Sequence, residues 1–108
     1  MIYTVEEIQS IIEPIAKKHG LKAVYLFGSY ARGTANEHSD IDLLIDTTGT
    51  DLDTFFKLGA VYADFAGALN KEIDLITVSS LEQPPQRPSD AMFRDSVIKE
   101  RKNVYAVA

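Results

Sequence analysis

The chain has 108 residues, enough for one modest hydrophobic core, and we expect a single domain over residues 1–108. A hydrophobic fraction of 45% and a charged fraction of 25% exclude wholesale disorder, and the absence of cysteine excludes disulfides and thiolate metal sites. The net charge of -5 makes nucleic acid an unfavoured partner. Without a signal-peptide pattern or an apolar run as long as a membrane span, the expectation is a cytoplasmic protein with no membrane contact.

The first predicted element is an N-terminal helix. Thr4 and Glu7 have the spacing of a capping box, and isoleucines recur behind them at steps of three and four residues. This pattern predicts a helix over residues 5–19 that ends at Gly20. Pro14 lies inside it and is expected to kink or break it.

Four strands are predicted from short apolar runs bounded by turn residues. They cover residues 22–27, 41–45, 72–78 and 103–107. The segment between the second and third strands is long enough for a parallel crossover or for an antiparallel return, and the sequence alone leaves both open. The order of elements predicts an α/β (α+β) fold, a small mixed β-sheet with flanking helices.

Two more helices are predicted, one on each side of the third strand. Asp51 or Asp53 caps the first, and Ser89 or Asp90 caps the second, which follows a proline-rich loop over residues 81–88. The aromatic residues of the first are expected in the core, and the apolar residues of the second form its apolar side. These are Phe55, Phe56, Tyr62 and Phe65 in the first helix, and Met92, Phe93, Val97 and Ile98 in the second.

Two acids flank the start of the second strand. Asp40 and Asp42 are two positions apart, so on a strand they point to the same face, about 6–7 Å apart at the backbone. Their mutual repulsion would be relieved by a divalent cation such as Mg²⁺ or Mn²⁺. Taken alone, the pair would be better explained as a turn residue followed by a solvent-facing acid.

The segment after the first strand has the features of a phosphate site. A strand that stops at Gly28 and turns into a helix leaves free backbone N–H groups, and Ser29 adds a hydroxyl donor. Gly28 and Gly33 allow close backbone approach, and Arg32 adds a cation. The alternative is an ordinary strand–helix turn in which Ser29 is the N-cap.

A third acid, Asp74, lies inside the apolar run of the third strand. If this strand lies beside the second, Asp74 could face Asp40 and Asp42. Three carboxylates can hold two metal ions about 3.5–4 Å apart, the arrangement used for in-line displacement at phosphorus, with Asp74 as the expected base. The alternative is an isolated strand-edge acid.

Together these residues resemble the nucleotidyltransferase superfamily of DNA polymerase β, and in particular its minimal nucleotidyltransferases, the MNT proteins. The family signature is Gly-Ser, ten residues, then Asp-x-Asp. Here Gly28-Ser29 is followed by ten residues and then by Asp40-Ile41-Asp42. The Arg32-Gly33 pair is also similar to the family pattern, and Asp74 matches the third metal ligand.

The resemblance implies the nucleotidyltransferase fold and a Mg²⁺-dependent enzyme, with two ions, that moves a nucleoside monophosphate from a nucleoside triphosphate, with ATP as the expected donor. It also implies an antitoxin whose acceptor is a tyrosine of a HEPN-type toxin. Two alternatives stay open: a nucleotidyltransferase with another acceptor, such as a small antibiotic or an RNA end, and a non-catalytic module that neutralises a partner by contact. Homodimer formation is also open.

Overall fold

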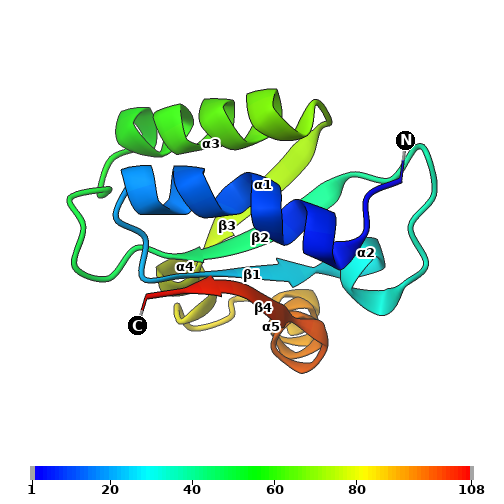
Figure 1. The fold of residues 1–108 in the computed structure, drawn as a ribbon. Coiled ribbons are helices and arrows are strands. Elements are labelled where there is room, and N and C mark those ends of the chain that lie inside the picture. Colours follow the sequence, from blue (N-terminus) through cyan, green and yellow to red (C-terminus); the bar gives the residue numbers. More distant parts are fainter. Residues whose placement is uncertain (1, 108) are drawn as a thin grey trace.

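A computed structural model describes residues 2–107 as one β-sheet with helices on both of its faces (Figure 1). The predicted elements are present, and one short helix, α4, was not predicted. The elements in chain order are α1 (Val5–Lys18), β1 (Ala23–Phe27), α2 (Gly28–Arg32), β2 (Ile41–Asp46), α3 (Phe55–Leu69), β3 (Ile73–Thr77), α4 (Val78–Leu81), α5 (Pro88–Glu100) and β4 (Lys102–Ala106).

The four strands form a mixed sheet in the order β3-β2-β1-β4. β1 pairs with β2 and with β4 in antiparallel orientation, whereas β2 and β3 are parallel. The α3 helix is therefore a crossover connection, which settles the alternative that the sequence left open. The mixed sheet with flanking helices that the order of elements predicted is confirmed.

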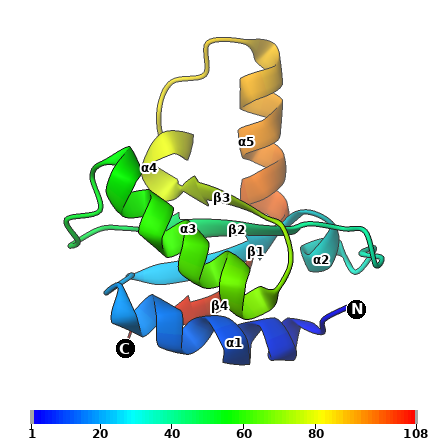
Figure 2. The same ribbon diagram turned by 90° about the horizontal axis from the view of Figure 1, so that it is seen from above.

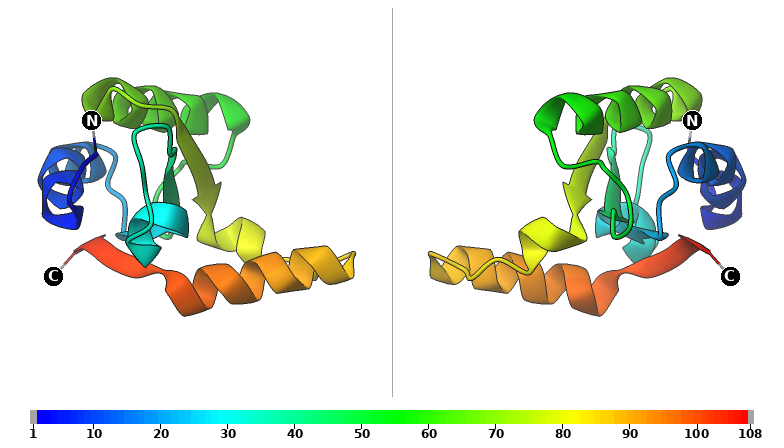
Figure 3. Two further views of the ribbon diagram at one scale, coloured as in Figure 1. Left: turned by 90° about the vertical axis from the view of Figure 1, so that its right-hand side faces the viewer. Right: turned by 90° about the vertical axis from the view of Figure 1, so that its left-hand side faces the viewer.

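The two faces of the sheet are covered differently (Figures 2 and 3). α1 and α3 lie side by side over one face, while α5 lies under the other face and extends beyond the β3 edge of the sheet. The main core lies between the sheet and the α1–α3 layer and includes Ile8, Ile12, Leu26, Leu43 and Phe65. On the opposite face, the buried residues Phe27, Leu44 and Val97 form a smaller cluster.

The α1 helix begins as predicted. The Thr4 hydroxyl accepts a hydrogen bond from the Glu7 N–H at 3.1 Å, and the Glu7 carboxylate accepts one from the Thr4 N–H at 2.9 Å. The expected break at Pro14 is absent, because the helix continues to Lys18. Pro14 is exposed, and so is Ser10, whose carbonyl loses its helical partner, so water can satisfy that carbonyl.

Two predictions for the α3 helix, its N-cap and the burial of its aromatic residues, are wrong in part. Its N-cap is Thr54, whose hydroxyl accepts from the Lys57 N–H, so neither Asp51 nor Asp53 caps it. Of its four aromatic residues only Phe65 is buried, whereas Tyr62 is 42%, Phe56 89% and Phe55 94% exposed. At 100° per residue, Phe56 is turned about 180° and Phe55 about 80° from Phe65, so neither lies in the buried stripe.

The α5 helix also starts differently from the prediction. Arg87 is the N-cap and Pro88 the first helical residue, because the fixed φ of proline suits that position, so Ser89 and Asp90 lie inside the helix. Of the apolar side that was predicted, only Val97 is buried. Ile98 is turned about 100° from Val97 around the helix, and the part of α5 that extends past the sheet is not covered by it. The exposed members are Met92, Phe93 and Ile98. No helix within residues 2–107 has the length and apolar character needed to cross a bilayer.

Candidate active site

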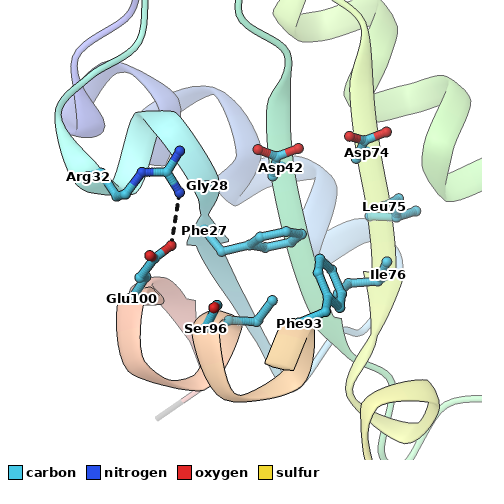
Figure 4. Close-up of a pocket in the computed structure, with 11 residues that line it drawn as sticks. Phe27, Gly28, Arg32, Asp42, Asp74, Leu75, Ile76, Phe93, Ser96 and Glu100 are labelled. Carbon is cyan, nitrogen blue, oxygen red and sulfur yellow. Dashed lines mark hydrogen bonds and ion pairs between the residues drawn. The ribbon is translucent and has the colours of Figure 1, made fainter. Parts of the chain in front are cut away.

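The parallel pairing of β2 with β3 places Asp42 directly beside Asp74. Residues paired in register point to the same face of a sheet, and both side chains point into one pocket (Figure 4). The pocket has a volume of about 430 Å³ and lies on the sheet face that α5 covers. Its lining residues are Phe27, Gly28, Arg32, Asp42, Asp74, Leu75, Ile76, Phe93, Ser96, Val97 and Glu100.

The two carboxylates perturb each other. Burial, hydrogen bonding with Asp74 and the negative charges of Asp74 and Asp40 together raise the pKa of Asp42 to about 7, and the charge of Arg32 opposes them. Asp42 therefore holds its proton to a higher pH than an ordinary aspartate does. A divalent cation between the carboxylates would remove the need for that proton.

Asp40 lies one residue before β2 and is exposed. Its charge acts on Asp42, but its side chain is not part of the pocket lining. Within residues 2–107, no three acidic or imidazole side chains lie close enough together to hold a metal ion unaided. The structure therefore brings together two of the three predicted acids in the pocket and leaves Asp40 outside its lining.

Gly28 is the residue that lets Asp42 fit against the backbone. Phe27, the last residue of β1, pairs with Asp42, and Gly28 follows with a φ of 72°. A Cβ atom at Gly28 would overlap the Oδ2 oxygen of Asp42. Both the positive φ and the close approach disfavour any residue with a Cβ atom here. The glycine therefore leaves the space that the Asp42 carboxylate occupies.

The other residues predicted for a phosphate site lie on or after α2. Ser29 is half-buried in its first turn and is not its N-cap, which is Phe27 and makes no side-chain hydrogen bond. Gly33 ends α2 in the left-handed conformation with a φ of 77°. The guanidinium of Arg32 lines the pocket and donates a hydrogen bond to Glu100 Oε2 at 3.0 Å.

The α5 side of the pocket was missed at the sequence level. The rings of Phe27 and Phe93 meet edge to face, with centroids 6.2 Å apart, and Glu100 approaches Arg32 from the end of α5. No local motif marks these residues, because α5 reaches the pocket only through the fold. Two other polar side chains of this region lie outside the pocket lining: Tyr30 is packed in the core and His38 is exposed on a loop.

A mixed sheet that holds paired carboxylates beside a strand–glycine–helix turn defines a domain suited to phosphoryl or nucleotidyl transfer. Residues 9–106 match the family model described as polymerase beta, nucleotidyltransferase. The chain belongs to this family, as the spacing of Gly28-Ser29 and Asp40-Ile41-Asp42 indicated.

Two relatives extend this assignment. A Methanocaldococcus jannaschii protein named "putative protein adenylyltransferase" is 33% identical over 101 residues, which are 93% of this chain and 97% of that protein. The protein adenylyltransferase MntA of Thermococcus cleftensis is 32% identical over 83 residues, which are 73% of this chain and 82% of that protein. The chain is thus a nucleotidyltransferase related to protein adenylyltransferases over most of its length.

Solved structures share the fold. One described as a "putative minimal nucleotidyltransferase" has a TM-score of 0.65 at 25% identity and covers 93% of this chain and 95% of its own. A toxin–antitoxin structure with AMP-PNP has a TM-score of 0.69 at 23% identity, over 92% of this chain and 73% of its own. The tri-AMPylated Shewanella oneidensis HEPN toxin in complex with MNT antitoxin gives 0.66 at 18% identity, over 96% and 74%. These likenesses confirm the nucleotidyltransferase fold.

Proposed function

We propose that this chain transfers AMP from ATP to a hydroxyl group of a partner protein, with a tyrosine of a HEPN-type toxin as the acceptor, and so acts as an antitoxin. The observation that carries the proposal is the Asp42–Asp74 pair, which faces a pocket beside the Gly28 turn. The names of the relatives support protein as the acceptor class. The tri-AMPylated HEPN toxin with its MNT antitoxin supports this choice of partner.

The residues present fit Mg²⁺. Asp42 and Asp74 offer hard oxygen ligands side by side, and the raised pKa of Asp42 reflects its burial and the negative charges beside it, both of which a divalent cation would offset. Asp40, two residues before Asp42, is the third acid, and its charge acts on Asp42. We assign these three acids as the ligands, with two ions as the expected number. When bound, the metal supplies charge stabilisation at the transferring phosphate.

The transfer itself is a single displacement at the α-phosphorus of the nucleotide. The acceptor oxygen forms a bond to this phosphorus, the bond to the oxygen bridging to the β-phosphate breaks, and pyrophosphate leaves. A phenol has a pKa of about 10, so it must lose its proton during the attack. Asp74, which is exposed at the pocket, accepts that proton.

The turn after β1 holds the phosphates. The Ser29 hydroxyl and the backbone N–H groups that follow Gly28 donate hydrogen bonds from the first turn of α2, and Arg32 supplies a guanidinium from the pocket lining. Gly33 gives α2 its left-handed end and so positions Arg32 one residue before it. The Phe27 and Phe93 rings form an apolar wall that a nucleobase or an acceptor ring can contact.

A contact-only antitoxin is the second candidate, and the exposed Phe55 and Phe56 favour it, because bare aromatic rings suit a protein interface. The deciding experiment incubates a HEPN-type toxin with Mg²⁺, ATP and either wild type or Asp42→Asn. Intact mass spectrometry should find added AMP units only with wild type. An unmodified toxin that is still inhibited by both proteins would establish the contact-only function instead.

A further inference from the structure

An ion pair between two distant segments crosses one side of the pocket (Figure 4). The Arg32 guanidinium at the end of α2 contacts the Glu100 carboxylate at the end of α5, with Nη1 and Oε2 3.0 Å apart. The side chains are 48% and 30% exposed, so the pair is partly shielded from water. Both residues also line the pocket, which makes this pair part of the site.

The charges that line the pocket indicate what the Arg32–Glu100 pair does to a bound nucleotide. The charged residues of the lining are one cation, Arg32, and three carboxylates, Asp42, Asp74 and Glu100. A nucleoside triphosphate is itself a polyanion, so it needs every cation that the site can offer. In this structure, the cation of the lining is already hydrogen-bonded to Glu100.

We infer that Glu100 is a built-in competitor for the nucleotide, a carboxylate that holds Arg32 until a phosphate group replaces it. Carboxylate and phosphate present similar oxygen acceptors to a guanidinium, so one can substitute for the other. The inference rests on the proposed function, because it takes a nucleoside triphosphate as the ligand. Glu100 thereby lowers nucleotide affinity, and nucleotide binding releases the end of α5 from α2.

The competing explanation is a structural clasp that only ties α5 to the body of the domain. The two explanations predict different changes in nucleotide affinity when the Glu100 charge is removed. Loss of a clasp would loosen the α5 side of the pocket and leave nucleotide affinity unchanged or weaker. Loss of a competitor frees Arg32 and strengthens binding, and the gain must disappear when Arg32 is absent.

The test measures binding of AMP-PNP with Mg²⁺ by titration calorimetry to wild type, Glu100→Gln, Arg32→Ala and the double variant. Glu100→Gln keeps the shape of the side chain and removes its charge, and we expect about three- to tenfold tighter binding. In the Arg32→Ala background the same change should have no effect. Asp95→Asn is the matched control, because Asp95 is exposed on α5 and outside this pocket, and its change of net charge is identical.

Equal or weaker binding by Glu100→Gln would overturn the inference. So would an equal gain in the Arg32→Ala background or in Asp95→Asn, because either would show a general charge effect. If Glu100→Gln fails to fold, Glu100→Asp replaces it, since its shorter side chain withdraws the carboxylate and should also tighten binding.

The outcomes also separate this inference from the proposed function. Tighter nucleotide binding by Glu100→Gln, without AMP transfer by wild type, would keep this inference and defeat the proposed transfer. No nucleotide binding by either protein would overturn both.

Discussion

The two faces of the sheet differ in the side chains that the same strands present: one face carries buried apolar residues, and the other carries the carboxylates. On β2, Ile41, Leu43 and Ile45 point into the large core under α1 and α3, while Asp42 and Asp46 alternate with them on the other face. Within residues 2–107, the core on the first face has sixteen buried residues and the cluster on the second has three. The closed face thus supplies stability, and the incompletely covered face leaves room for carboxylates, water and ligand.

The comparison predicts that substitutions on the closed face change stability and that those on the open face change chemistry. The strongest test on the closed face is Phe65→Ala, because Phe65 is fully buried and its loss leaves a cavity. The free energy of unfolding, from urea titration, should fall by about 3–5 kcal/mol. Phe56→Ala on the same helix is the control and should stay within about 0.5 kcal/mol of wild type, since Phe56 is 89% exposed. A similar loss in both variants would contradict the division between buried and exposed faces of α3.

On the open face, Asp42→Asn should lower the rate of AMP transfer by at least about a hundredfold, because it removes a charge that stabilises the transferring phosphate through its metal. The measurement is transfer of label from α-labelled ATP. Asp46→Asn is the matched control, since Asp46 lies on the same strand and face but outside the pocket lining, where it accepts a hydrogen bond from the Thr48 N–H. Wild-type turnover by Asp42→Asn would remove Asp42 from the site.

Local patterns predicted the parts of this molecule that local chemistry determines. The Thr4–Glu7 capping box and the strand that begins at Ile41 depend on neighbours within a few residues, and both were predicted correctly. The pairing of Asp42 with Asp74 required knowing that α3 is a crossover, which periodicity does not reveal. Glu100 reaches Arg32 across 68 positions of sequence, so no spacing rule could find it.

The errors on α3 have a different cause. Phe55 and Phe56 were assigned to the core because aromatic residues are usually buried, but position on the helix decides burial. Phe56 is nine residues from Phe65, or two and a half turns, and so points the opposite way. Counting the helical angle from Val61, Phe65 and Leu69, which share one buried stripe, would have separated the exposed ring from the buried one.

Gly28→Ala should affect both stability and chemistry, because Gly28 joins the closed sheet to the open site. Its left-handed φ costs an alanine about 1–2 kcal/mol, and the overlap with Asp42 adds a similar amount, for a total of about 2–4 kcal/mol. AMP transfer should fall as well, because the Asp42 carboxylate must move away. Gly33→Ala is the control for stability: it has a similar φ but open space around its Cβ position, so a smaller loss of stability is expected. Equal transfer by Gly28→Ala and wild type would show that the close approach has no function.

The smallest effect concerns pH and should have opposite signs at two aspartates of β2. The pKa of Asp42 is about 7 in the folded protein and 3.8 in the unfolded chain, so the folded state binds the proton more tightly. Its contribution to stability is therefore fully present below pH 3.8, declines as the pH rises, and is lost above pH 7. Because Asp42 is only half-buried, the full linkage is reduced by solvent to about 1–2 kcal/mol.

In metal-free buffer at pH 8, Asp42→Asn should be more stable than wild type by about 1–2 kcal/mol, although we expect it to be inactive in AMP transfer. This difference in stability should be smaller at pH 5. Asp46 supplies the contrast, because hydrogen bonds from Thr48 lower its pKa. Its contribution is present at neutral pH and is lost as the pH falls through its folded pKa, so Asp46→Asn should be less stable than wild type at pH 8. Urea titrations of the three proteins at both pH values measure these differences. If Asp42→Asn were also less stable at pH 8, the Asp42 carboxylate would be stabilised by its surroundings, and the argument that the Asp42–Asp74 pair requires a cation would fail.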